Sequence, residues 1–440
     1  MKWLSTLIIS GAVLVAVMQF IPLSIFDVDT LQTVQSNQSA PTVTNQADLI
    51  ATTEPHTEVD SRRVVTHVPI PDAVRSIYMS ACVAGTPSFR DRLVTLINET
   101  ELNAVMIDIK DYSGTISFRP EGASWLPAWE GASCGARDMR EFIASLHAQG
   151  IFVIGRITVF QDPFYAPQHP DLAVQQSDQQ TVWRDGKGLA FIDVAAKPYW
   201  DHIVELAVES YNVGFDELNF DYVRYPSDGN MQDIYFPQST LGQYGADKAA
   251  NLEAFFAYLK EQLDDESAFA AVRHEHTGRE KSIPWTSADL FGMTASNYDD
   301  LSIGQVQERA VPYFDFIAPM VYPSHYPHGF LNGRNPNDFP YEVVYKAMSS
   351  GVQRLQASTT PVVGFAHTRI GTSTPAVFDK PVFGPDKLRT WIQDFDYGGD
   401  YDAADVRAQI QASYDAGVTS WMIWAPSNRY TRAALLDDVQ

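Results

Sequence analysis

Residues 215–226 read Phe-Asp-Glu-Leu-Asn-Phe-Asp-Tyr-Val-Arg-Tyr-Pro, and this stretch decides the fold. Side chains alternate between the two faces of a strand, so Glu217, Asn219 and Asp221 point to one side. A polar face opposite a largely apolar one suits a barrel strand, with helices outside and an open mouth inside. Pro226 cannot continue a central strand, so the strand stops there. Asp221 is then either a site residue or an ordinary buried carboxylate that binds neighbouring backbone groups.

Short apolar runs elsewhere in the chain predict seven more strands. They lie near residues 77–82, 104–110, 151–159, 288–294, 314–322, 361–367 and 420–425. Helices are expected between them, at 88–100, 137–149, 198–213 and 403–416. Three of these helices are followed by a glycine and then a strand, at Gly150, Gly214 and Gly417.

This alternation predicts an α/β fold, a (β/α)8 TIM barrel with enlarged βα loops. An open doubly wound sheet is the alternative. The sequence disfavours the doubly wound sheet, because no glycine-rich phosphate loop follows the first strand.

The amino-terminal part of the chain has a different composition. Residues 1–26 are almost entirely apolar after Lys2, which predicts a transmembrane anchor, with a cleaved signal peptide as the alternative. Residues 27–70 are rich in Ser, Thr, Gln, Asn, Ala and Pro and are expected to form a flexible linker. The barrel domain then covers 71–440. We therefore expect a cell-envelope protein, membrane-anchored with its barrel outside the cytoplasm, or secreted if the segment is cleaved.

The overall charge restricts the partners. The chain carries 31 basic and 54 acidic residues, a net charge of −23, which argues against nucleic acid and against an anionic membrane surface as the main partner. Its two cysteines, Cys82 and Cys134, are too few for a zinc site. They form either one disulfide or two buried free thiols.

Carboxylates stand near the carboxyl ends of several predicted strands. Asp221 ends the fourth, Asp108 ends the second and Asp289 lies near the fifth. Glycoside hydrolysis needs two carboxyl groups beside the bond, and a barrel supplies such groups from the ends of different strands. We expect Asp221 to be the main catalytic carboxylate, Asp108 its leading partner and Asp289 the second choice.

Other polar groups are expected around these carboxylates. Glu217 shares the face of Asp221 but lies deeper, as a supporting charge or as the partner of Arg156 in a floor ion pair. Arg224 could keep Asp221 ionised or bind a substrate carboxylate. The remaining candidates for substrate binding are Tyr322, His325, Trp424 and the loop residue Tyr112, and His367 is expected to follow the seventh strand.

The long segments after the strands are rich in aromatic residues, which can stack on sugar rings or simply pack the loops. No histidine pair has ligand spacing and no Gly-x-Ser-x-Gly is present, so neither a metal site nor a serine triad is predicted. No cofactor is expected.

The run 214–226, with Met-Ile-Asp-Ile-Lys-Asp at 106–111 and Ala-Pro-Met-Val-Tyr-Pro at 318–323, resembles a bacterial family of glycoside hydrolases with a TIM-barrel domain. That family was long carried as a domain of unknown function. The resemblance covers nearly all of 71–430, including Trp-Met-Ile-Trp at 421–424. It implies a TIM barrel that hydrolyses a glycosidic bond.

A more distant similarity is to the chitinase-like barrels of glycoside hydrolase family 18. Their fourth strand carries three Asp residues and then a Glu that acts as the acid. Asp216, Asn219 and Asp221 fall on the Asp positions, but Val223 falls on the position of the Glu. The similarity therefore does not support that acid, while Asp221 resembles the fourth-strand Asp of other glycosidases. Trp424 matches the last-strand Trp that floors the sugar site of such barrels.

Together these observations predict a glycosidase that acts on a polysaccharide or oligosaccharide. The alternative is a non-catalytic carbohydrate-binding or scaffold protein on a degenerate barrel, which the Val at position 223 favours and the retained Asp108 and Asp221 oppose. An exported deacetylase or esterase would need a metal triad or an activated serine, and the sequence shows neither.

Overall fold

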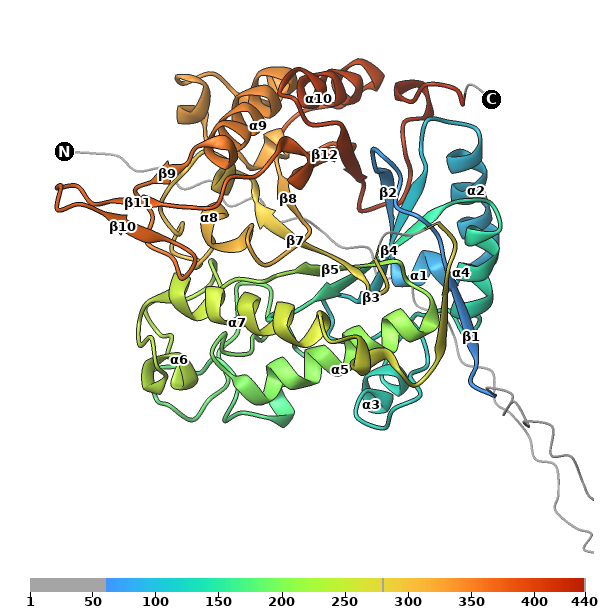
Figure 1. Cartoon of the computed structure of the whole chain (residues 1–440), viewed down its shortest axis with the longest axis horizontal. Coiled ribbons are helices and arrows are strands. Elements are labelled where there is room, and N and C mark those ends of the chain that lie inside the picture. The colour runs from blue at the N-terminus through green and yellow to red at the C-terminus, as the bar shows by residue number, and fades with distance from the viewer. Residues whose placement is uncertain (1–60, 279–280, 439–440) are drawn as a thin grey trace, which may run out of the picture. The chain divides into compact units, whose positions relative to one another are not determined.

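The computed structural model describes residues 61–278 and 281–438. Eight parallel strands form a closed barrel in the order β12-β13-β2-β3-β4-β5-β7-β8, with β12 pairing β8 to close it (Figure 1). Their bounds are β2 Arg75–Met79, β3 Ala104–Lys110, β4 Phe152–Thr158, β5 Glu217–Asp221, β7 Trp285–Phe291, β8 Phe316–Met320, β12 Arg389–Gln393 and β13 Ser420–Trp424. The predicted eight-stranded α/β barrel is confirmed.

Helices surround the barrel. The longer ones are α2 Pro87–Asn98, α4 Met139–His147, α5 Lys197–Val213, α7 Lys248–Leu263, α9 Pro340–Gln356 and α10 Ala403–Asp415. The shorter ones are α1 Ala81–Ala84, α3 Leu126–Glu130, α6 Pro237–Leu241 and α8 Gln307–Ala310. Helices α5 and α7 pack together on one side of the barrel, and α9 and α10 pack together on the opposite side (Figure 1).

The glycines predicted to end helices do so. Gly150, Gly214 and Gly417 follow α4, α5 and α10 with φ of 72°, 131° and 89°. These values lie where side chains with a Cβ are disfavoured, so glycine lets the chain turn directly from helix towards strand.

The seventh barrel strand differs from the prediction. Residues 361–367 form no barrel strand; they belong to an excursion with a small antiparallel sheet of β9 Thr359–Thr360, β10 Thr368–Ile370 and β11 Val377–Asp379. The apolar run at 361–367 predicts a buried strand, but it is not part of the hydrophobic core: Val363 is 56% and Phe365 45% exposed. The true strand, β12, contains buried polar residues whose partners are far away in sequence: Arg389 binds Glu217 inside the barrel, and Thr390 contacts Ser413 on α10.

Part of the predicted linker is folded. Residues 64–67 form β1 Val64–His67, which pairs in parallel with β6 Arg273–His276 and contacts α4. The predicted linker end at residue 70 is therefore corrected. The anchor at 1–26 and most of the linker lie outside the described residues and stay predictions. Within the described ranges, no helix has the length and apolar character to cross a membrane.

A disulfide joins two loops on the barrel. Cys82 in α1 and Cys134, in the loop between β3 and α4, are bonded, with their Cα atoms 4.7 Å apart. Of the two alternatives left open by the sequence, the structure has the disulfide.

Candidate active site

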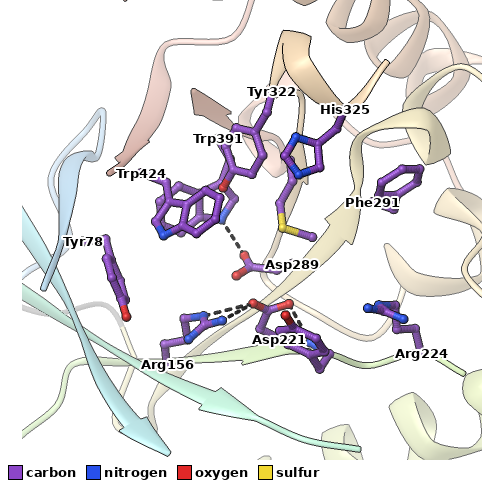
Figure 2. Close-up of a pocket in the computed structure, with 12 residues that line it drawn as sticks. Tyr78, Arg156, Asp221, Arg224, Asp289, Phe291, Tyr322, His325, Trp391 and Trp424 are labelled. Atoms are coloured by element: carbon purple, nitrogen blue, oxygen red, sulfur yellow. Dashed lines mark hydrogen bonds and ion pairs between the residues drawn. The ribbon is translucent and has the colours of Figure 1, made fainter. Parts of the chain in front are cut away.

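A cavity of about 190 Å³ opens at the carboxyl ends of the barrel strands (Figure 2). Most of the strands contribute a side chain at or just beyond their ends, and the loops after β5 and β8 add the others. The cavity is lined by Tyr78, Arg156, Asp221, Tyr222, Arg224, Asp289, Phe291, Met320, Tyr322, His325, Trp391 and Trp424.

Asp221 stands at the end of β5, on the inward face that the sequence predicts. The strand stops there because Tyr222 takes a left-handed φ of 51°, and its backbone N–H turns back to donate to Oδ1 of Asp221. Arg156 on β4 donates to Oδ2 of Asp221 through Nε at 3.0 Å and through Nη2 at 2.6 Å. This charge-assisted pair holds the carboxylate of Asp221 in a fixed place.

Asp289 on β7 differs from Asp221 because its hydrogen-bond partners are neutral donors. It is 1% exposed, and Oδ1 accepts from Nε1 of Trp391 at 2.7 Å and from Nδ2 of Asn219 at 2.9 Å. Burial, followed by the negative charge of Asp221, raises the pKa of Asp289 to about 8. Oδ2 accepts no hydrogen bond from the described residues and is the atom that can carry the proton. The raised pKa favours the protonated form of Asp289 near neutral pH.

The strand register explains why Asp289, and not Asp108, stands beside Asp221. Asp108 on β3 is in register with Arg156, and Arg156 is in register with Asn219, one two-residue repeat before Asp221. The register of β5 with β7 instead puts Asp289 opposite Asp221. Asp108 is therefore one repeat deeper than the carboxylates of the cavity and does not line it.

Asp108 is a second carboxylate partner of Arg156. It accepts from Nη1 of Arg156 at 2.7 Å and from the hydroxyl of Tyr78. Burial raises the pKa of Asp108, and the charge of Arg156 opposes this rise. Asp108, the expected leading partner, therefore does not line the cavity, whereas Asp289, the expected second choice, does.

Glu217 lies in the barrel floor. Both of its carboxylate oxygens accept from Nη1 of Arg389, at 2.6 and 2.7 Å, and Oε1 also accepts from Ser287. The partner expected from the sequence, Arg156, is bound to Asp221 instead. Glu217 does not line the cavity, so it is a structural charge and not a substrate ligand.

Aromatic rings form one wall of the cavity. The rings of Tyr322 and Trp424 lie 5.1 Å apart with an angle of 34°, and the imidazole of His325 stands 5.4 Å from Tyr322 (Figure 2). Burial and the charge of Lys187 lower the pKa of His325, so its imidazole is neutral at pH 7. An apolar wall beside two carboxyl groups suits the apolar face of a sugar ring.

Six of the nine predicted site residues line this cavity: Asp221, Asp289, Arg224, Tyr322, His325 and Trp424. Tyr112 does not; its side chain is 61% exposed on the loop after β3. His367 donates from Nδ1 to the carbonyl of Val362 within the excursion that contains β9, β10 and β11, and it is not among the lining residues.

Sequence reasoning missed five contributors to the cavity from the strands: Arg156 as the partner of Asp221, and Tyr78, Phe291, Met320 and Trp391 as lining residues. Strand alternation offered a signal for Arg156, because it falls two residues from Thr158 and Ile154 on the inward face of β4. Trp391 had no such signal, since its strand was not predicted.

Within the described ranges, no group of three or more His, Cys, Asp or Glu side chains is arranged to hold a metal ion. The acid position of family 18 chitinases, Val223, is fully buried in the hydrophobic core and does not line the cavity.

A known family, described as "Putative glycosyl hydrolase domain", matches residues 76–430. The chain belongs to this family. It is accordingly a glycosidase, and the family match includes every residue that lines the cavity. No curated protein sequence matches the chain.

Two solved structures are similar to this chain or to part of it. The PgaB (BpsB) glycoside hydrolase domain from Bordetella bronchiseptica aligns with a TM-score of 0.51 and 13% identity, over 83% of this chain and 94% of that one. A hypothetical protein from Ruminiclostridium thermocellum is 28% identical over 46% of this chain and 96% of its own, with a TM-score of 0.36. The first likeness supports the fold of this glycosidase family member.

Proposed function

We propose that the chain hydrolyses a polysaccharide with Asp221 and Asp289 as its two catalytic carboxyl groups. The observation that carries the proposal is the contrast between them within one cavity. Arg156 binds Asp221 through two hydrogen bonds, whereas Asp289 accepts only from neutral donors among the described residues, and burial and the charge of Asp221 raise its pKa to about 8. Two carboxyl groups whose environments push their ionisation apart are the arrangement that glycoside hydrolysis requires.

The roles follow from these protonation states. Asp289 is the general acid: its Oδ2 proton passes to the glycosidic oxygen as the bond to the anomeric carbon breaks. Asp221 is the anion that faces the developing positive charge of the oxocarbenium-like transition state. A water molecule adds to the anomeric carbon in place of the leaving sugar, and the proton that it loses restores the acid form of Asp289. The wall of Tyr322 and Trp424 packs on the sugar ring.

The test is hydrolysis of a panel of bacterial and plant polysaccharides by residues 61–440, as wild type, Asp221→Asn and Asp289→Asn. Asp91→Asn, on the exposed face of α2, is the matched control. We expect either cavity variant to lose about 10²- to 10⁴-fold in rate with folding intact, and the control to lose none. Undiminished hydrolysis by Asp221→Asn would exclude the two-carboxylate mechanism. Glycan binding without hydrolysis by any form would favour the carbohydrate-binding alternative.

We also propose that the barrel acts outside the cytoplasm. The Cys82–Cys134 disulfide supports this, because such bonds form and persist in oxidising compartments. Fractionation of cells that make the full chain, with thiol alkylation before lysis, tests it. The oxidised protein should be found in the envelope or medium, and a reduced protein in the cytoplasm would contradict the proposal.

A further inference from the structure

Arg224 is a cation of the cavity that has no carboxylate partner among the described residues. Its Nη1 donates to the carbonyl of Tyr225 at 3.1 Å and to Oγ of Ser227 at 3.3 Å. These bonds fix the guanidinium, which also lies over the ring of Tyr222, 5.0 Å from its centre. Nε and Nη2 make no hydrogen bond to the described residues, so two donors of a rigid, planar group remain for a ligand.

The charges in the cavity lining do not balance. Arg156 is paired with both Asp221 and Asp108, the raised pKa of Asp289 and the lowered pKa of His325 favour their neutral forms, and Arg224 has no carboxylate partner among the described residues. Figure 2 shows Arg156 and Arg224 on opposite sides of Asp221. Arg224 therefore faces the space beside the reacting bond and not the pair that supports Asp221.

The nearby loop at 185–188 does not neutralise Arg224. Its acidic residue, Asp185, accepts the backbone N–H groups of Lys187 and Leu189 through Oδ1 and makes no ion pair with Arg224. Lys187 itself is exposed and has no ion-pair partner in the described part of the chain, yet it lies close enough to His325 to affect it electrostatically.

We propose that Arg224 selects substrates in which the sugar at the cavity carries an anionic substituent, a uronic-acid carboxylate or a sulfate ester. A carboxylate or a sulfate offers two oxygens to the two remaining donors of Arg224, in the paired geometry that guanidinium groups favour. Lys187 adds long-range attraction at the rim. The substrate class is thus an acidic polysaccharide. This inference rests on the proposed hydrolase site.

Binding separates this inference from the proposed chemistry. The Asp289→Asn variant keeps the neutral charge of that position at pH 7 and should bind substrate without turnover. Titration calorimetry would compare oligomers of galacturonic, glucuronic and mannuronic acid with the same oligomers after carboxyl reduction, and sulfated galactan oligomers with their desulfated forms. We expect one anionic series to bind at least about tenfold more tightly than its neutral counterpart. The series that does so identifies the substituent as a carboxylate or a sulfate.

The same titrations with a second substitution assign the effect to Arg224. Arg224→Met, made in the Asp289→Asn background, should abolish the preference for the anionic series, and Arg224→Lys should restore only part of it. Arg92→Met is the control, because Arg92 also lies over an aromatic ring, that of Phe89, but is exposed on α2. Equal binding of anionic and neutral oligomers, or a preference that survives Arg224→Met, would overturn the inference. Hydrolysis of neutral glycans that depends on Asp221 would leave the proposed function standing while this inference fails.

Discussion

Arg156 donates two hydrogen bonds, from Nε and Nη2, to a single oxygen of Asp221, Oδ2. Its third nitrogen, Nη1, donates to Asp108. One guanidinium thus connects a carboxylate of the cavity with a carboxylate one strand repeat deeper. A lysine offers one charged point and cannot make all three contacts.

Arg156→Lys should therefore misplace Asp221 while keeping a positive charge. We expect kcat to fall about 10- to 100-fold, the effect of losing one or two charge-assisted hydrogen bonds, with a smaller change in KM. Steady-state kinetics on the substrate found in the panel measures this. Arg92→Lys on α2 serves as the control, and a kcat equal to that of wild type would show that Arg156 does not position Asp221.

The basic limb of the pH profile should belong to Asp289. Burial and the charge of Asp221 raise its pKa to about 8, and an acid catalyst works only while protonated. Activity should therefore fall as pH rises through about 8. In Asp289→Asn the residual activity should lack this limb. A limb that persists in the variant would assign the ionisation to another group.

Asp289 should also weaken the fold as pH rises. The folded state keeps the proton up to a pH of about 8, whereas the unfolded chain releases it near 4, so between these values the unfolded state binds fewer protons and stability declines with pH. Denaturant unfolding at pH 5 and pH 8 should show a smaller decline for Asp289→Asn than for wild type. An equal decline in both would mean that Asp289 is ionised in the folded protein.

Trp391→Phe should move the basic limb upward. The indole N–H of Trp391 donates to Oδ1 of Asp289 and lowers its pKa against the larger effect of burial. Phenylalanine keeps an aromatic ring but has no donor, so the pKa of Asp289 should rise further. A limb that moves to lower pH, or does not move, would contradict this assignment of the hydrogen bond.

Glu217→Gln should destabilise the barrel without acting on the chemistry directly. It leaves the cation of Arg389, which is 1% exposed, buried without a counter-charge, and loss of one partner of such a pair typically costs about 3–5 kcal/mol. Denaturant unfolding measures the loss. Glu342→Gln, which breaks the exposed pair with Arg334, is the control and should change stability little.

The sequence was sufficient to predict the barrel and the place of Asp221. Alternation along 217–221 shows which face is polar, and this pattern is local to one strand. It was not sufficient to choose between Asp108 and Asp289. Both follow apolar runs in the same way, and the choice depends on the hydrogen-bond register between strands, which no single strand encodes.

The seventh strand was missed for a related reason. Arg389, Thr390 and Gln393 give β12 a polar composition, and their partners lie far away in sequence: Arg389 binds Glu217, and Thr390 contacts Ser413. The hydrogen-bond partners of these buried polar residues are close only in the folded protein. The sequence of the strand therefore lacks an apolar run and is typical of a loop. Trp391 was not predicted as a site residue because this strand was not predicted.

The measurement that tests the two-carboxylate account most directly is the dependence of rate on the leaving group. Aryl glycosides of the preferred sugar, with leaving phenols from strongly acidic to weakly acidic, would be hydrolysed by wild type, Asp289→Asn and Asp221→Asn. The account predicts that Asp289→Asn hydrolyses the most acidic phenol nearly as fast as wild type and fails on the others, while Asp221→Asn fails on all of them. Equal losses of Asp289→Asn across the whole series would contradict the role of Asp289 as the acid.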